Sequence, residues 1–138
     1  MARVSQNELI DRLVESCRTI VLLGGIDSGK TSFGLSLAEA ARRKGISVAY
    51  VDADLDQSTV GPPTCVGLKF CTDLAKVEAN SVREADELGF VGSYSAEGHL
   101  IGVVAGTSRL VTRAREAGCR LVIVETGTLI SGTDAELL

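Results

Sequence analysis

The chain has 138 residues, of which 45% are hydrophobic, and it carries 14 lysines and arginines against 18 aspartates and glutamates. These values are typical of one globular domain and exclude a chain that is disordered throughout. The net charge of −4 argues against a protein that coats nucleic acid or an anionic membrane by bulk electrostatics. A polyanion would therefore have to be bound at a local site.

The cysteines and the N-terminal segment indicate a reducing compartment. The four cysteines have no C-x-x-C spacing, and the single histidine, His99, cannot complete a zinc site with them, so we expect reduced and mostly buried thiols. Residues 1–8 lack the apolar core of a signal peptide, and no apolar run approaches the ~20 residues that span a bilayer. We expect a cytoplasmic protein with no membrane partner.

Hydrophobic periodicity predicts alternating helices and strands in the first half of the chain. Residues 5–17 form an amphipathic helix with a serine cap, which we expect to cover an edge or face of a sheet. Residues 19–23 form a buried strand, residues 31–44 a helix that ends before a glycine, and residues 46–51 a second buried strand. A strand, helix and strand of these lengths imply a right-handed parallel crossover.

The second half is less regular. A glycine and two prolines at 61–63 interrupt regular structure, and residues 73–87 show no clear pattern. Residues 88–91 predict a short strand, 98–117 a helix and 121–124 another buried strand. In this helix we expect a buried stripe that leaves two arginines on a solvated face; the stripe is Leu100, Val104, Thr107 and Val111, and the arginines are Arg109 and Arg113.

A phosphate-binding loop follows the first strand. Residues 24–31 fit the pattern G-x-x-x-x-G-K-[ST] and lie between a predicted strand and a predicted helix, the context that this motif requires. The glycines let backbone N–H groups surround phosphate oxygens, Lys30 adds a full positive charge, and Thr31 can offer its hydroxyl to Mg²⁺. The candidate nucleotide-binding residues are Gly24, Gly25, Ile26, Asp27, Ser28, Gly29, Lys30, Thr31 and Ser32. The fold class is therefore α/β, a P-loop NTPase with a mainly parallel sheet and helices on both faces, in one domain over residues 1–138.

An acidic segment, residues 51–57, follows the second strand. Ligands gather at the carboxyl ends of strands in an open parallel sheet, so Asp52 and Asp54 should lie beside the phosphate loop. If the strand continues, the two carboxylates share a face, where they can hold Mg²⁺ or accept a proton from an attacking hydroxyl. Gln57 can orient a nucleophile. The alternative is a solvated acidic loop that only caps the following turn.

Four sequence blocks resemble the polynucleotide 5′-hydroxyl kinases, the RNA kinase family related to the pre-mRNA cleavage complex and to ribosomal RNA processing kinases. The blocks occur in the family's order at residues 26–31, 51–57, 61–68 and 90–100, followed by Gly106-Thr107 and Arg109-Leu110. The resemblance implies transfer of the ATP γ-phosphate to the 5′-hydroxyl of RNA or DNA, with RNA-processing proteins as partners. By this resemblance Lys30 neutralises phosphate charge, Thr31 helps to hold Mg²⁺, Asp54 activates the hydroxyl, and Gln57 matches the family's glutamine.

Two departures from the family concern the C-terminal part. After the last predicted strand, Thr126 matches a residue of the family's substrate clasp, but the next threonine and glycine are reversed and there is no tryptophan. Residues 134–138 resemble the start of a helix, and the resemblance implies that an arginine-bearing lid and further strands follow. We therefore expect the chain to be C-terminally incomplete and to transfer phosphate weakly or not at all by itself.

Two other functions fit the same motifs. One is a P-loop ATPase of the partition or dethiobiotin-synthetase type, although the partition type usually has a lysine where this chain has Gly25. The other is a non-catalytic scaffold in RNA processing that uses ATP to fix its shape. We expect His99 to have a structural role at the start of its helix.

Overall fold

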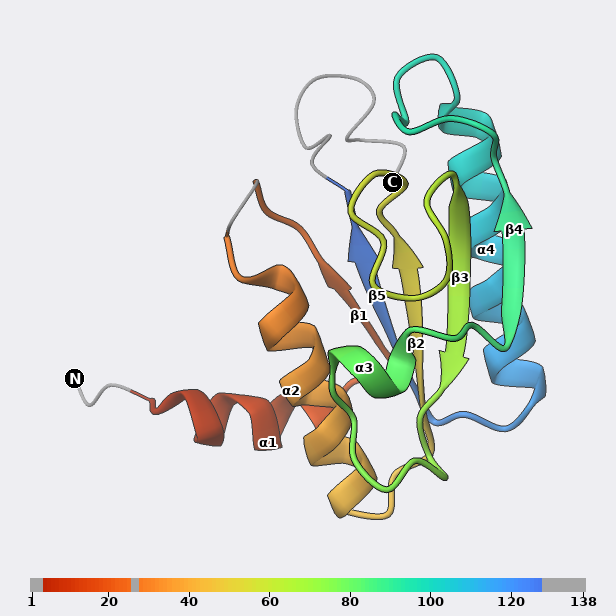
Figure 1. The fold of residues 1–138 in the computed structure, drawn as a ribbon. Helices are drawn as coiled ribbons and strands as arrows, with labels where there is room; N and C mark the ends of the chain where they lie inside the picture. Colours follow the sequence, from red (N-terminus) through yellow and green to blue (C-terminus); the bar gives the residue numbers. More distant parts are fainter. Residues whose placement is uncertain (1–3, 26–27, 128–138) are drawn as a thin grey trace.

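The computed structural model describes residues 4–25 and 28–127, which form a five-stranded sheet with helices on both faces (Figure 1). The elements are α1 (Gln6–Ser16), β1 (Thr19–Leu22), α2 (Lys30–Arg43), β2 (Val48–Ala53), β3 (Cys65–Phe70), α3 (Ala79–Val82), β4 (Glu87–Phe90), α4 (Leu100–Glu116) and β5 (Leu121–Thr126). The α/β class is therefore confirmed. No helix among the described residues is long and apolar enough to cross a membrane.

The sheet has the order β1-β5-β2-β3-β4. The pairs β1–β5 and β5–β2 are parallel, whereas β2–β3 and β3–β4 are antiparallel. The sheet is thus mixed, and only β3 runs against the other four strands. Four of the five strands point the same way, in agreement with the expectation of a mainly parallel sheet. The strand β3 was not predicted, because the glycine and two prolines at residues 61–63 before it suggested irregular structure.

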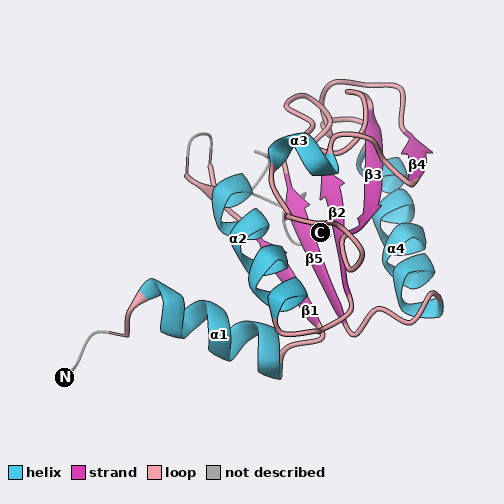
Figure 2. Ribbon diagram, turned by 60° about the horizontal axis from the view of Figure 1, so that its bottom comes forward, coloured by secondary structure: helices cyan, strands magenta, loops and turns pink. Residues whose placement is uncertain are grey.

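Figure 2 shows α1 and α2 on one side of the sheet and α4 on the other. Leu37, Tyr50 and Ile123 belong to the core between α2 and the sheet, and Val51 and Leu110 belong to the core between α4 and the sheet. The buried β2 and β5 supply alternate side chains to the two cores, as expected for central strands that are covered on both faces.

The first helix is confirmed with its cap. Ser5 Oγ accepts a hydrogen bond from the Glu8 amide at 3.2 Å, and the Glu8 carboxylate accepts one from the Ser5 amide at 3.2 Å. This reciprocal pair is a capping box. Ile10 and Val14 are buried on the helix face that packs beside α2.

The buried stripe of α4 differs from the prediction. Val103, Leu110 and Ala114 are the buried residues of the helix, so the stripe lies about one position away from the expected one. The helix is consequently rotated, and Arg109 and Arg113 face the edge of the sheet: the Arg109 guanidinium donates to Leu88 O at 2.9 Å, and Arg113 pairs with Glu87 at 2.7 Å. Both arginines therefore join α4 to β4 instead of lying on an unpartnered face.

The described cysteines are free thiols, as expected. Cys65 and Cys71 are buried, and Cys17 and Cys119 are partly buried. Burial raises the pKa of the Cys71 thiol to about 12. These side chains therefore act as small hydrophobic residues in the core.

Candidate functional site

The phosphate loop connects β1 to α2 at the edge of the sheet where β1, β5 and β2 end (Figure 1). Gly29 lies directly before α2 with φ of 84°, a left-handed conformation that favours glycine. A Cβ on Gly24 would lie 2.5 Å from Ser28 Oγ, so the two ends of the loop approach each other closely. This close turn brings the unpaired N–H groups of the first turn of α2 to the loop, an arrangement suited to binding an anion.

Of the other expected nucleotide-binding residues, Ser28 and Ser32 are exposed. Ile26 and Asp27 lie outside the described residues. The expected contacts of these residues with a nucleotide stay predictions.

Lys30 places its ammonium group across the loop. Its Nζ donates to Gly24 O at 2.7 Å and to Gly127 O at 3.2 Å, and it therefore lies between the end of β1 and the end of β5. Both acceptors are neutral carbonyl oxygens. An anionic phosphate is a stronger acceptor than a carbonyl, so this ammonium can exchange these bonds for bonds to a nucleotide.

Thr31 belongs to a hydrogen-bond chain, partly buried at Thr31 and buried at Tyr50, that the sequence did not predict. Its hydroxyl donates to Glu125 Oε1, and the hydroxyl of Tyr50 donates to Glu125 Oε2 at 2.6 Å. Glu125 is only 2% exposed. The sequence feature that could have indicated Glu125 is its position directly after the apolar run 121–124, because in a parallel sheet this position lies beside the phosphate loop.

Asp52 lies within β2 and not after its end, because the strand extends to Ala53. Its Oδ1 accepts from the Asp54 amide at 2.9 Å, and its Oδ2 accepts from the amides of Thr59 and Val60, the latter at 3.0 Å. The side chain is 1% exposed, and burial raises the pKa of this carboxyl to about 7 although the amides of Val60 and Asp54 oppose the shift. The carboxyl of Asp52 therefore shapes the loop after β2, and its expected role as a magnesium ligand stays a prediction.

The same loop packs closely on β3. A Cβ on Gly67 would lie 2.3 Å from Val60 O, which leaves no space for a side chain. Gly67 is also the antiparallel partner of Asp52 in β3. The strand β3, which the sequence did not predict, therefore packs directly against the loop after β2 and supports it.

Asp54 faces a different environment from Asp52. Its Oδ1 accepts from the amides of Asp56 and Gln57 at 3.1 and 3.0 Å, so it caps the following turn. Capping of this turn was the alternative to a catalytic role in the sequence analysis. It also lines a cavity of about 350 Å³ together with Thr126 and the loop at residues 94–97. The two carboxylates therefore do not share a site, contrary to the expectation from strand alternation.

Asp54 nevertheless lies close to the phosphate loop. A Cβ on Gly127 would be 3.9 Å from Asp54 Oδ1, and the Gly127 carbonyl accepts from Lys30. The end of β5 therefore connects the phosphate loop to the cavity of Asp54. Gln57 is exposed, and it is not among the residues that line this cavity.

Thr126, expected to contact the substrate, is 3% exposed. Its hydroxyl donates to Leu22 O at 2.8 Å and joins β5 to the end of β1. This bond gives Thr126 a structural role, and its contact with a substrate stays a prediction. His99 is the residue before α4, but its side chain makes no capping hydrogen bond; its Nδ1 lies 3.2 Å from Glu97 O.

The oxygen donors of this site suit magnesium. Thr31 supplies a hydroxyl and Glu125 a carboxylate, and both are hard ligands of the type that Mg²⁺ prefers. Within residues 4–25 and 28–127, no group of three His, Cys, Asp or Glu side chains could hold a metal ion alone. This agrees with the usual binding of Mg²⁺ by one or two side chains together with substrate phosphates.

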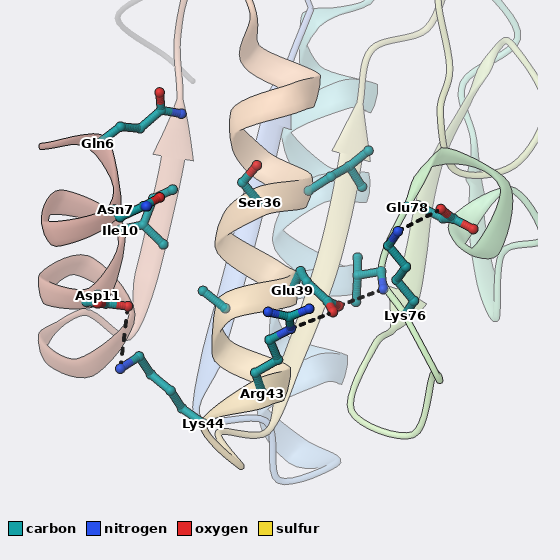
Figure 3. A pocket seen from close by; sticks show the side chains of 13 residues that line it. Gln6, Asn7, Ile10, Asp11, Ser36, Glu39, Arg43, Lys44, Lys76 and Glu78 are labelled. Carbon is teal, nitrogen blue, oxygen red and sulfur yellow. Dashed lines mark hydrogen bonds and ion pairs between the residues drawn. The ribbon is translucent and has the colours of Figure 1, made fainter.

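A second hollow, of about 870 Å³, lies between α1, α2 and residues 76–78 (Figure 3). Its charged side chains pair with one another, as in Lys44 with Asp11 at 3.4 Å and Lys76 with Glu78 at 3.7 Å. Hydrogen bonds from Arg42 and from the Val77 amide, with the nearby Arg42 charge, lower the pKa of the Glu39 carboxyl to about 2. The α2 residues that line this hollow begin at Leu35, and its lining does not include the phosphate loop.

The fold and the loop geometry define a P-loop nucleotide-binding domain. Residues 24–138 match the family described as mRNA cleavage and polyadenylation factor CLP1 P-loop, and the chain belongs to this family. The resemblance to the polynucleotide kinase P-loop family is thereby confirmed, which favours it over the partition and dethiobiotin-synthetase types.

Similar proteins include three archaeal proteins named polyribonucleotide 5′-hydroxyl-kinase. The protein of Methanocaldococcus jannaschii is 35% identical over 120 residues, and those of Pyrococcus furiosus and Thermococcus kodakarensis are each 32% identical over 120 residues. Each match covers 86% of this chain and 32 or 33% of the relative. The chain therefore spans about a third of the length of these relatives.

Proposed function

We propose that the chain is the ATP-binding core of a cytoplasmic polynucleotide 5′-hydroxyl kinase, which transfers the ATP γ-phosphate to the 5′-hydroxyl of RNA or DNA. The observation that carries the proposal is the meeting of two parts at the end of β5. Gly127 accepts from Lys30 of the phosphate loop and lies beside Asp54 of the neighbouring cavity. A phosphate donor and a hydroxyl acceptor can thus be held next to each other.

In this proposal Lys30 and the backbone amides of the loop bind the β- and γ-phosphates and stabilise the charge that develops during transfer. The Asp54 carboxylate accepts the proton of the attacking 5′-hydroxyl. The new bond joins the 5′-oxygen to the γ-phosphorus while the bond to the β–γ bridging oxygen breaks, so that ADP leaves. Because phosphoryl transfer depends mainly on positioning and charge stabilisation, few residues need to act chemically.

Magnesium supplies charge neutralisation on the phosphates when it is bound. Thr31 and Glu125 are the residues that would hold it in this chain. Gln57 completes the proposed site as the residue that orients the nucleophile from the turn after Asp54. The description of the matched family and the resemblance of the four blocks support RNA processing as the setting, and we propose RNA-processing proteins as partners.

The test is transfer of label from γ-labelled ATP to 5′-hydroxyl RNA and DNA. It compares the unaltered protein with Lys30→Ala and Asp54→Asn, and it uses Asp73→Asn as a charge-matched control because Asp73 is exposed in the turn after β3. We expect the first two variants to lose at least about 100-fold in rate and the control to be unaffected.

The assay is run on the 138-residue chain and on a protein that spans the full length of the relatives. If the extended protein binds ATP but labels no oligonucleotide, the kinase proposal is wrong. That result favours the scaffold, which binds ATP without transferring phosphate.

A further inference from the structure

Among residues 4–25 and 28–127, the buried carboxylate of Glu125 has no cationic side chain as a partner. It is 2% exposed, and it forms none of the ion pairs within the described part of the chain. The donors to its two oxygens in the described structure are neutral hydroxyl groups, those of Thr31 and Tyr50. A buried carboxylate without a cation is costly, so this arrangement is typical of a site where the positive charge arrives with a ligand.

The neighbouring Asp52 shows that this arrangement is specific to Glu125. The two residues are register partners in the parallel pair of β2 and β5. Asp52 accepts from three backbone amides, which satisfy its oxygens within the loop. The Glu125 carboxylate accepts from no backbone amide among the described residues, and one of its two donors is a residue of the phosphate loop.

The contact with Thr31 prepares the hydroxyl of that residue for a cation. A threonine hydroxyl has one hydrogen and two lone pairs. Since the hydrogen is donated to Glu125, the lone pairs stay available for a metal ion. The orientation of the Glu125 carboxylate therefore decides how the Thr31 oxygen is presented.

Tyr50 fixes that orientation from the core. Its side chain is fully buried, and its hydroxyl lies 2.6 Å from Glu125 Oε2. A Cβ on Gly34 of α2 would be 2.6 Å from the Tyr50 hydroxyl, so the helix packs tightly against it.

We propose that Tyr50 is a positioning residue of the nucleotide site: its buried hydroxyl holds the Glu125 carboxylate against Thr31 and thereby prepares the Thr31 oxygen for the magnesium ion of a magnesium-nucleotide complex. The inference rests on the nucleotide site of the proposed function. It does not require transfer to a polynucleotide.

The test measures the equilibrium affinity for a fluorescent ATP analogue, once with excess Mg²⁺ and once with EDTA. The ratio of the two affinities reports how much magnesium contributes. We expect Tyr50→Phe, which removes only the hydroxyl, to reduce this ratio roughly five- to tenfold, mainly by weakening binding in Mg²⁺. Glu125→Gln, which keeps the volume and removes the charge, should reduce the ratio at least as much.

The matched control is Thr107→Val, which removes a buried hydroxyl that has no hydrogen-bond partner within the described structure. It should leave the ratio unchanged. A purely structural role of Tyr50 would lower thermal stability and both affinities together, leaving the ratio as in the unaltered chain, and that outcome overturns the inference. Absence of any magnesium effect in the unaltered chain would overturn it too, whereas magnesium-dependent binding without polynucleotide labelling contradicts only the kinase proposal.

Discussion

The buried carboxyl of Asp52 gives a pH-dependent prediction that separates two physical effects. Burial raises the pKa of Asp52 to about 7 from an ordinary value of 3.8, while the amides of Val60 and Asp54 favour the ionised form. If burial dominates, the folded protein binds one more proton than the unfolded chain between these two values. The free energy of unfolding then falls as pH rises through this window.

The substitution Asp52→Asn removes the titration and keeps the shape of the side chain. With pKa values of 3.8 unfolded and about 7 folded, the Asp52 contribution becomes less favourable by about 2–3 kcal/mol between pH 5 and pH 8. The unaltered chain should therefore lose about that much stability relative to the variant over this range. The single carbonyl oxygen of the introduced amide can accept from two of the three backbone N–H groups, so a pH-independent cost of about 1–3 kcal/mol accompanies the change.

The assay is urea unfolding of both proteins at pH 5, 6, 7 and 8, with Asp73→Asn as the exposed control. Comparing differences between proteins removes the effects of the groups that both share. If the stability difference between the unaltered chain and the variant does not change over this range, the carboxyl is ionised throughout it in both states, the three amides outweigh burial, and the reasoning is refuted.

Two further predictions concern glycines. Gly24→Ala should weaken nucleotide binding by roughly tenfold or more, because the added Cβ would lie 2.5 Å from Ser28 Oγ, whereas Gly102→Ala, in α4 and outside the loop, should change the measured Kd little. Gly34→Ala should lower the free energy of unfolding by about 1–3 kcal/mol in urea, because the added Cβ would lie 2.6 Å from the buried Tyr50 hydroxyl. The exposed Gly102→Ala, whose nearest contact is an ordinary 3.7 Å, should stabilise α4 by up to about 1 kcal/mol. Equal effects of the two substitutions in either pair would contradict the packing argument.

The sequence by itself determined the parts of the molecule that depend on local patterns. The capping box of α1, the apolar runs of β1 and β5, and the phosphate loop before α2 all follow from residues close together in the chain. The position of Lys30 and Thr31 at the start of a helix was also evident, because the spacing of the motif fixes it.

Only the tertiary structure decided which distant residues meet. Thr31, Tyr50 and Glu125 come from α2, β2 and β5, and no pattern along the chain records that the order of the sheet places β5 between β1 and β2. The different roles of Asp52 and Asp54 were equally hidden, because alternation applies only while a strand continues and β2 ends between them. The strand β3, which supports the loop joining them, pairs with residues far away in the sequence, and such pairing follows from burial in the folded sheet and not from local preference.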